Sequence, residues 1–242
     1  MRPFDARFTP LQQRLIVVLE ILLCSSLPTQ LIITNVLVIA GWTPFLPDGS
    51  YSLPFVLTSQ LADTLVLVVL MTFFMRFHGE SASTLWFGEG RARRELLVGL
   101  MYVPVVFFLA VILLNAIRLF APWLHNVPNN PLEKMAGTTA SDAATFAVVA
   151  IVAGGVREEL QRAFLLHRFE RYLGGAMVGV VVTSVAFGLG HLPQGWDAAI
   201  TTGTMGFFWA LIYLDRRSSV APIVSHAGFN SLEILRIALV GQ

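Results

Sequence analysis

Long apolar runs separated by short polar segments dominate the pattern of hydrophobic and polar positions along the chain. A helix needs about 20 mostly apolar residues to cross a membrane. Seven stretches approach or exceed this length, at residues 15–42, 54–77, 96–123, 143–166, 175–190, 198–214 and 220–240. Glu20 and Pro28 interrupt the first stretch, so we expect a kink or a break there.

The same pattern excludes a membrane β-barrel. The sequence lacks the ten-residue alternating segments of barrel strands, and an open sheet edge is not viable in lipid. The pattern therefore predicts an all-α fold, a polytopic transmembrane helical bundle of about seven spans.

The distribution of positive charge predicts the orientation of the bundle. With seven spans, eleven arginines flank the helices on one side: Arg2, Arg7, Arg14, Arg76, Arg91, Arg93, Arg94, Arg168, Arg171, Arg216 and Arg217. The opposite loops contain little charge beyond Asp48, Arg118, Lys134 and Asp197. Because positive loops remain in the cytoplasm, we expect a multi-pass membrane protein with a cytoplasmic N-terminus.

Composition narrows the class of protein further. Of 242 residues, 55% are hydrophobic and 13% are charged, whereas a soluble domain contains about 25% charged residues. The net charge of +1 gives no electrostatic case for nucleic acid as a partner. A single cysteine, Cys24, excludes an internal disulfide framework and a multi-cysteine zinc module. We expect a single membrane domain, residues 1–242, whose partners are membrane lipid and membrane-associated molecules.

The fourth apolar stretch contains an unusual charged cluster. Ionisable groups inside a span cost about 2.5–3.5 kcal/mol each and face the bundle interior or a watery cavity. Arg162 lies four residues after Glu158 and three after Glu159, so it can pair with either carboxylate on one helix face. Two adjacent carboxylates in a low dielectric resist joint ionisation, as expected of a general base or acid. The alternative is a solvated helix end, because more charges follow at Arg168, Glu170 and Arg171.

Two histidines accompany this cluster on later spans. His191 follows Phe187 by four residues, and Asn230 follows His226 by four, so His226 and Asn230 can point into one cavity. A glutamate and two histidines that converge form either a metal site with an open position or a water-activating base with its helpers. A nearby asparagine amide can donate to a developing oxyanion. The implied reaction is hydrolysis of an amide or peptide bond.

Together, these motifs resemble the CPBP family of intramembrane proteases, also called the CAAX-processing and bacteriocin-processing or Abi family. The family pattern is Glu-Glu-x-x-x-Arg, then Phe-x-x-x-His, then His-x-x-x-Asn, on successive transmembrane helices. Phe187 and His191 match the second motif, and His226 and Asn230 match the third. The resemblance covers residues 140–235, which it identifies as a CPBP-like catalytic core.

The first motif is one residue short, because it is Glu158-Glu159-Leu160-Gln161-Arg162. If Arg162 is held in register, Arg157 stands at the first glutamate position and Glu158 at the second. If the glutamate pair is held in register, Ala163 stands at the arginine position. We favour Glu158 as the base, because it is present in both alignments and shares a helix face with Arg162, and Glu159 is the fallback. The departure also fits a catalytically inactive relative.

The resemblance implies an intramembrane endopeptidase, acting on a CAAX-like or bacteriocin-like substrate, in a bacterial plasma membrane. It implies that Glu158 and His191 activate water, that His226 and Asn230 stabilise the oxyanion, and that Arg162 binds the glutamate cluster. Metal-dependent and glutamate-type mechanisms both stay open. In the former, Glu158, His191 and His226 would bind Zn²⁺.

Two alternatives remain. One is a non-catalytic membrane scaffold or immunity protein of the same fold, which the short first motif favours. The other is a proton-coupled carrier, suggested by Glu20, Asp63 and the Glu158–Glu159 pair in spans, although the visible repeat symmetry of carriers is absent. Otherwise we expect Glu20, Asp63 and Glu233 to bond with helix neighbours or to lie near an interface.

Overall fold

The structure, a computed structural model, describes residues 4–88, 92–128, 130, 135 and 139–240. These residues form helices and contain no named strand. The main helices are α1 (Pro10–Leu23), α2 (Leu27–Ile39), α3 (Leu53–His78), α4 (Ala82–Phe87), α5 (Ala92–Phe120), α7 (Ala140–Val149), α8 (Glu158–Tyr172), α9 (Ala176–Gly190), α10 (Trp196–Arg216) and α11 (Val220–Val240). A π-helix, η3 (Ala150–Arg157), joins α7 to α8, and short 3-10 turns lie at Phe4–Ala6, Pro122–Leu124 and Leu192–Gln194.

Four helical segments are long and apolar enough to cross a membrane: Pro10–Ile39, Leu53–His78, Ala92–Phe120 and Ala140–Tyr172. The shorter helix α9 is also apolar. The prediction of an all-α membrane bundle is therefore confirmed. The last two expected spans coincide with α10 and α11, but the total of seven stays a prediction.

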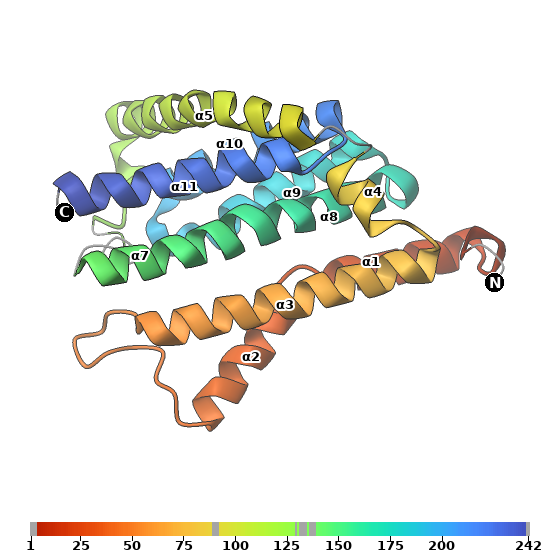
Figure 1. Cartoon of the computed structure of the whole chain (residues 1–242), viewed down its shortest axis with the longest axis horizontal. Coiled ribbons are helices and arrows are strands. Elements are labelled where there is room, and N and C mark those ends of the chain that lie inside the picture. Colours follow the sequence, from red (N-terminus) through yellow and green to blue (C-terminus); the bar gives the residue numbers. More distant parts are fainter. Residues whose placement is uncertain (1–3, 89–91, 129, 131–134, 136–138, 241–242) are drawn as a thin grey trace.

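The expected interruption of the first span is a true break between α1 and α2. Ser26 adopts a left-handed conformation with φ of 69°, which is uncommon for a residue other than glycine. Pro28 follows in the first turn of α2, where its missing N–H costs no helical hydrogen bond. The chain changes direction here, and α2 leans away from α1 in Figure 1.

The C-terminal helices form a closely packed body. In Figure 1, α5, α10 and α11 lie together, with α7, η3, α8 and α9 beside them and α1 and α3 along one side. One core packs Leu67 and Met71 of α3 against Phe164 of α8. A second core packs Val106 of α5 against Trp209 of α10. Many large apolar side chains, such as those of α5, remain exposed, as expected of helices that face lipid.

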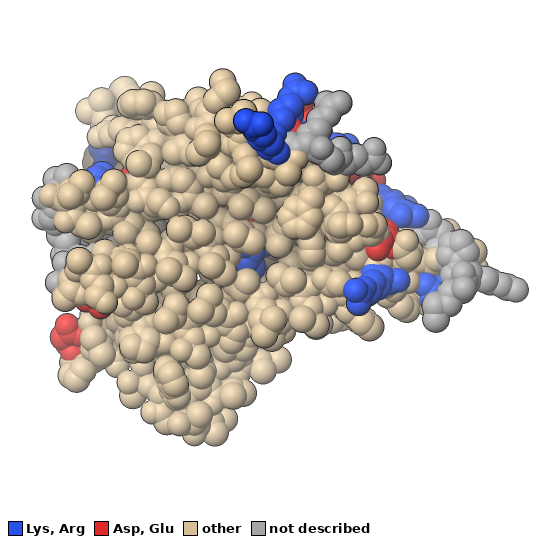
Figure 2. Space-filling model, in the orientation of Figure 1, with Lys and Arg blue, Asp and Glu red and all other residues tan. Residues whose placement is uncertain are grey.

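Charge gathers at the ends of the bundle. Figure 2 shows most of the visible lysine and arginine surface at the end that carries the N-terminus and α4, while the middle of this face is largely uncharged. This distribution agrees with a membrane protein. The cytoplasmic location of the N-terminus stays a prediction.

A cluster of ionisable side chains, three of them buried, joins α1, α8 and the C-terminal end of α3 with the residues that follow it, at the end of the bundle near the N-terminus. Glu20 contacts His78 Nε2 at 2.7 Å and accepts a hydrogen bond from Arg168 Nε at 2.7 Å. Arg168 also donates to Glu80 at 2.6 Å, and Glu80 contacts His167 at 2.9 Å. We call these five residues the end cluster. The expectation that Glu20 bonds with helix neighbours is confirmed.

Candidate active site

Two glycines in the π-helix allow α11 to approach the charged segment closely. A Cβ atom on Gly155 would lie 2.7 Å from the Cβ of Ala227. A Cβ atom on Gly154 would lie 2.6 Å from Nδ2 of Asn230. At Gly155 no larger side chain fits without movement of α11, whereas at Gly154 the Asn230 side chain would have to move. Segments of π-helix occur frequently at functional sites, and this one ends directly before Glu158.

Glu159 is the buried carboxylate of the pair, with 2% of its surface exposed. It accepts hydrogen bonds from Arg162, at 3.0 Å from Nε and 3.2 Å from Nη2. It also lies 2.9 Å from Nδ1 of His226 on α11. All of these partners are themselves buried, so Glu159 binds α8 to α11 through a closed set of charged contacts.

Of the two carboxylates that helical spacing offers to Arg162, the structure pairs it with Glu159. Among the described residues, no hydrogen bond or ion pair joins Arg162 to Glu158. The guanidinium carbon of Arg162 lies 4.8 Å above the ring of Phe187 on α9. Glu159 lies on this same side of α8, whereas Glu158 turns toward Arg157.

Glu158 is the accessible carboxylate. Its side chain is 19% exposed, against 1% for Glu159. Oε1 accepts a hydrogen bond from Arg157 Nη2 at 3.1 Å, and Oε2 lies 3.9 Å from Nε2 of His226. A separation of 3.9 Å is too long for a direct hydrogen bond between Oε2 of Glu158 and Nε2 of His226. A water molecule beside the two atoms can contact both of them. The two nitrogens of His226 therefore have separate roles: Nδ1 contacts Glu159 and Nε2 faces Glu158.

Aromatic rings restrain the imidazole of His226. Trp209 of α10 stacks on it, with ring centroids 3.7 Å apart and an interplanar angle of 17°. Phe187 meets the same imidazole edge-on at 6.0 Å. Trp209 is fully buried and donates through Nε1 to Ser225 at 3.2 Å. Sequence reasoning did not identify Trp209 as a site residue. Its signal in the sequence is weak, because Trp209 lies five residues from the end of the expected span 198–214, where an interfacial tryptophan is also typical.

His191 joins the cluster through Phe187. Its ring centroid lies 4.8 Å from that of Phe187, and its Nδ1 contacts the Phe187 carbonyl at 2.8 Å. Among the described residues, no hydrogen bond joins His191 to Glu158. The structure thus places His191 and His226 against the same phenyl ring.

Asn230 lies one turn beyond His226 on α11. Its Nδ2 donates to the carbonyl of Ala150 at 3.1 Å, at the start of the π-helix. Among the described residues it has no hydrogen bond to Glu158 or to either histidine. The structure brings Glu158, Glu159, Arg162 and His226 into direct proximity, and it places Asn230 beside the same π-helix.

The arrangement does not fit a metal centre as it stands. A catalytic zinc site needs three protein ligands around one ion. Within the part of the chain that the structure describes, no group of three or more His, Cys, Asp or Glu side chains is placed to bind a metal ion. The suggested set of Glu158, His191 and His226 therefore has no geometric support, and we derive no step through a metal.

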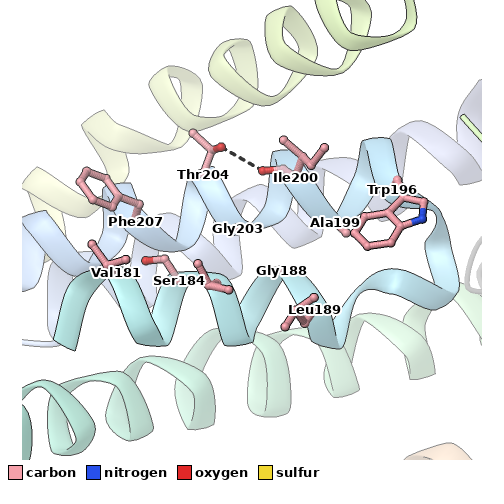
Figure 3. Close-up of a pocket in the computed structure, with 11 residues that line it drawn as sticks. Val181, Ser184, Gly188, Leu189, Trp196, Ala199, Ile200, Gly203, Thr204 and Phe207 are labelled. Atoms are coloured by element: carbon pink, nitrogen blue, oxygen red, sulfur yellow. Dashed lines mark hydrogen bonds between the residues drawn. The ribbon is translucent and has the colours of Figure 1, made fainter. Parts of the chain in front are cut away.

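An apolar groove of about 490 Å³ lies between α9 and α10. Its lining includes Gly188 and Leu189, which precede His191 in the sequence. Figure 3 shows side chains of both helices along it, and glycines of both helices, Gly188 and Gly203, where the backbones approach. None of the predicted catalytic residues lines this groove. Ser184 lies along it, and its buried hydroxyl has no hydrogen-bond partner among the described residues.

The fold and the site together indicate a class of protein. It is a helical membrane protein in which an accessible carboxylate, Glu158, faces an imidazole, His226, that aromatic rings hold in place. Residues 140–232 match the family model described as type II CAAX prenyl endopeptidase Rce1-like. This match confirms the predicted resemblance to the CAAX protease family over these residues, which are fewer than half of the chain. No curated protein and no solved structure matches the chain. The family supports endopeptidase activity in general, and α1 to α5 lie outside the matched residues.

Proposed function

We propose that this protein is an intramembrane endopeptidase that hydrolyses a peptide bond of a membrane-associated, CAAX-like or bacteriocin-like substrate. The observation that carries the proposal is the accessible Oε2 of Glu158, which faces Nε2 of His226 at 3.9 Å. A carboxylate in this position can remove a proton from water. The family match supports the general reaction, hydrolysis of a peptide bond.

In the proposed mechanism, Glu158 accepts a proton from a water molecule that also contacts a histidine. The water oxygen attacks the peptide carbonyl carbon, and the negative charge moves to the carbonyl oxygen. Glu158 then returns the proton to the leaving nitrogen as the C–N bond breaks. By resemblance to the family, His191 assists Glu158, whereas His226 and Asn230 donate to the oxyanion. His226 donates from Nε2 as the imidazolium, because its Nδ1–H already points at Glu159.

Glu159 and Arg162 support these steps without contact with the substrate. The contact between Glu159 and Nδ1 of His226 leaves Nε2 available on the side of Glu158. Arg162 balances the buried charge of Glu159, since an unpaired buried carboxylate is strongly unfavourable. This arrangement favours Glu158 as the base and gives Glu159 a positioning role.

We place this activity in a single membrane domain, residues 1–242, with residues 140–235 as its catalytic core. We also propose that the N-terminus lies in the cytoplasm and that the protein is located in a bacterial plasma membrane. The excess of arginine in the loops expected on one side of the membrane supports this orientation.

The test is cleavage by the purified protein in liposomes. Two internally quenched peptides serve as probes: a farnesylated peptide ending in Cys-aliphatic-aliphatic-X, and an unprenylated peptide with a membrane-inserting leader. We expect cleavage of at least one. We expect Glu158→Gln to lower kcat by about 10²- to 10⁴-fold, and His226→Ala and His191→Ala to lower it as well.

The matched control is Glu233→Gln. Glu233 lies on α11, like His226, but pairs with Arg236 near the surface. This variant keeps the wild-type rate. Wild-type rates in Glu158→Gln, His191→Ala and His226→Ala together would overturn the proposal.

The short first motif favours one second candidate, a non-catalytic scaffold or immunity protein of the same fold. In that case the wild-type protein cleaves neither peptide, and a binding or resistance phenotype survives Glu158→Gln and His191→Ala.

A further inference from the structure

Arg157 connects the candidate base to the N-terminal helices. Its Nη2 donates to Glu158 Oε1 at 3.1 Å, and its Nη1 donates to Asp63 Oδ2 on α3 at 2.6 Å. Asp63 is fully buried and Arg157 is 5% exposed. The guanidinium of Arg157 is thus shared between the buried carboxylate of Asp63 and the accessible carboxylate of Glu158.

Further polar groups restrain both ends of this bridge. Thr29 of α2 donates to the other oxygen of Asp63, and Gln30 donates to Oδ2 at 3.4 Å. Arg157 also donates to the hydroxyl of Ser26, the left-handed residue at the α1–α2 break, at 3.1 Å. Arg157 therefore contacts both the α1–α2 break, through Ser26, and the middle of α3, through Asp63.

The geometry has a consequence for Glu158. A guanidinium binds a carboxylate best through two parallel hydrogen bonds. Arg157 makes only one to Glu158, because Asp63 and Ser26 bind its Nη1 and its Nε donates to the carbonyl of Ala153. Oε2 of Glu158 is left free to face His226. Without the charge of Asp63, Glu158 would be the remaining carboxylate in contact with a buried guanidinium. A two-bond pair would then occupy the oxygen that the base needs.

We propose that Asp63 is a positioning residue of the active site, which acts through Arg157 to keep Glu158 available. This inference rests on the proposed function. It also assigns the N-terminal helices, which lie outside the family match, a direct part in the site.

The test compares Asp63→Asn, Arg157→Gln and the double variant in the liposome assay. We expect Asp63→Asn to lower kcat by about 10- to 100-fold, since small displacements of a reacting group can cost this much, with little change in KM. If Asp63 acts through Arg157, the double variant is faster than Asp63→Asn alone. A merely structural role predicts a double variant that is as slow or slower.

Glu95→Gln is the matched control. Glu95 is also a buried acid, and it pairs with Arg216 through two hydrogen bonds of 2.5 and 2.9 Å on α5 and α10. This variant lowers the thermal unfolding temperature and leaves kcat per folded molecule unchanged.

A second readout does not depend on activity. Cys24 is the only cysteine and is fully buried beside the α1–α2 break, where its carbonyl accepts a hydrogen bond from Gln161. We expect Asp63→Asn to increase the rate of maleimide labelling of Cys24, whereas Glu95→Gln leaves the rate unchanged. An unchanged rate in Asp63→Asn overturns the inference.

The two proposals fail in different ways. Wild-type cleavage by Glu158→Gln, His191→Ala and His226→Ala together contradicts the proposed function, and the labelling rate still tests the contact between Asp63 and Arg157. Loss of cleavage in Glu158→Gln with normal kcat in Asp63→Asn contradicts only the inference. A double variant whose kcat is no higher than that of Asp63→Asn also contradicts only the inference.

Discussion

Two groups of acids, arginines and histidines differ in how completely the oxygens of their carboxylates are paired. In the end cluster, both oxygens of Glu20 have close partners, and Glu80 contacts His167, Arg168 and Arg171. Where α8 meets α11, Glu159 is equally enclosed. Glu158, in contrast, keeps one oxygen without a hydrogen bond among the described residues, and this oxygen faces the similarly unbonded Nε2 of His226.

This comparison separates a structural ion cluster from a candidate catalytic one on physical grounds. A buried carboxylate whose two oxygens both have close partners has no free oxygen to accept a proton from a substrate or from water, and loss of one partner is costly for folding. A carboxylate with a free oxygen and partial exposure can accept a proton. Residue type alone does not make this distinction, because both groups contain the same three kinds of side chain.

The largest expected effect comes from the end cluster. Glu20→Ala leaves Arg168 and His78 without their shared carboxylate, so we expect a loss of about 3–5 kcal/mol in the free energy of unfolding. The measurement is unfolding in detergent, with kcat determined per folded molecule. A large fall in kcat of the folded fraction would show that the end cluster is not merely structural.

A smaller effect is expected where α11 approaches the π-helix. Gly155→Ala places a methyl group 2.7 Å from the Cβ of Ala227, and such overpacking costs about 1–3 kcal/mol. Displacement of α11 also moves His226 away from Glu158, so kcat falls too. Gly190→Ala is the control for stability, because its new Cβ would meet nothing within 4 Å. Equal stability of the two variants would contradict the close packing.

The smallest effect is a pH dependence of the end cluster. Burial opposes ionisation of Glu80, but His167 and Arg168 outweigh it and lower the pKa of Glu80 from 4.5 to about 2. Because the folded-state pKa is the lower one, this stabilisation is present above pH 4.5 and is lost as the pH falls toward 2. Unfolding temperatures at pH 6, 4 and 3 measure the loss.

The side chains of His167, Arg168 and Arg171 all face Glu80. We therefore expect the decline in unfolding temperature to be less steep in Glu80→Gln. An equally steep decline in that variant would assign the effect to other carboxylates.

Hydrophobic pattern and helix chemistry were sufficient to predict much of this protein. Apolar run length predicted the membrane helices, and Pro28 with Glu20 predicted the break between α1 and α2. The cost of charge inside a span identified the segment from Arg157 to Arg162 as a buried cluster. These properties are local, because they depend on residues within a few helical turns.

The partner of each charged group was decided only by tertiary structure. Helical spacing permits Arg162 to pair with either Glu158 or Glu159, and the position of Phe187 on α9 accompanies the choice of Glu159. The contact of Asp63 with Arg157 joins residues 94 positions apart, and the stacking of Trp209 on His226 joins two different helices. The sequence by itself determined which segments form helices and which of them carry charge. Packing decided which face of each helix meets which neighbour, because side-chain contacts between helices depend on crossing geometry that short-range periodicity does not contain.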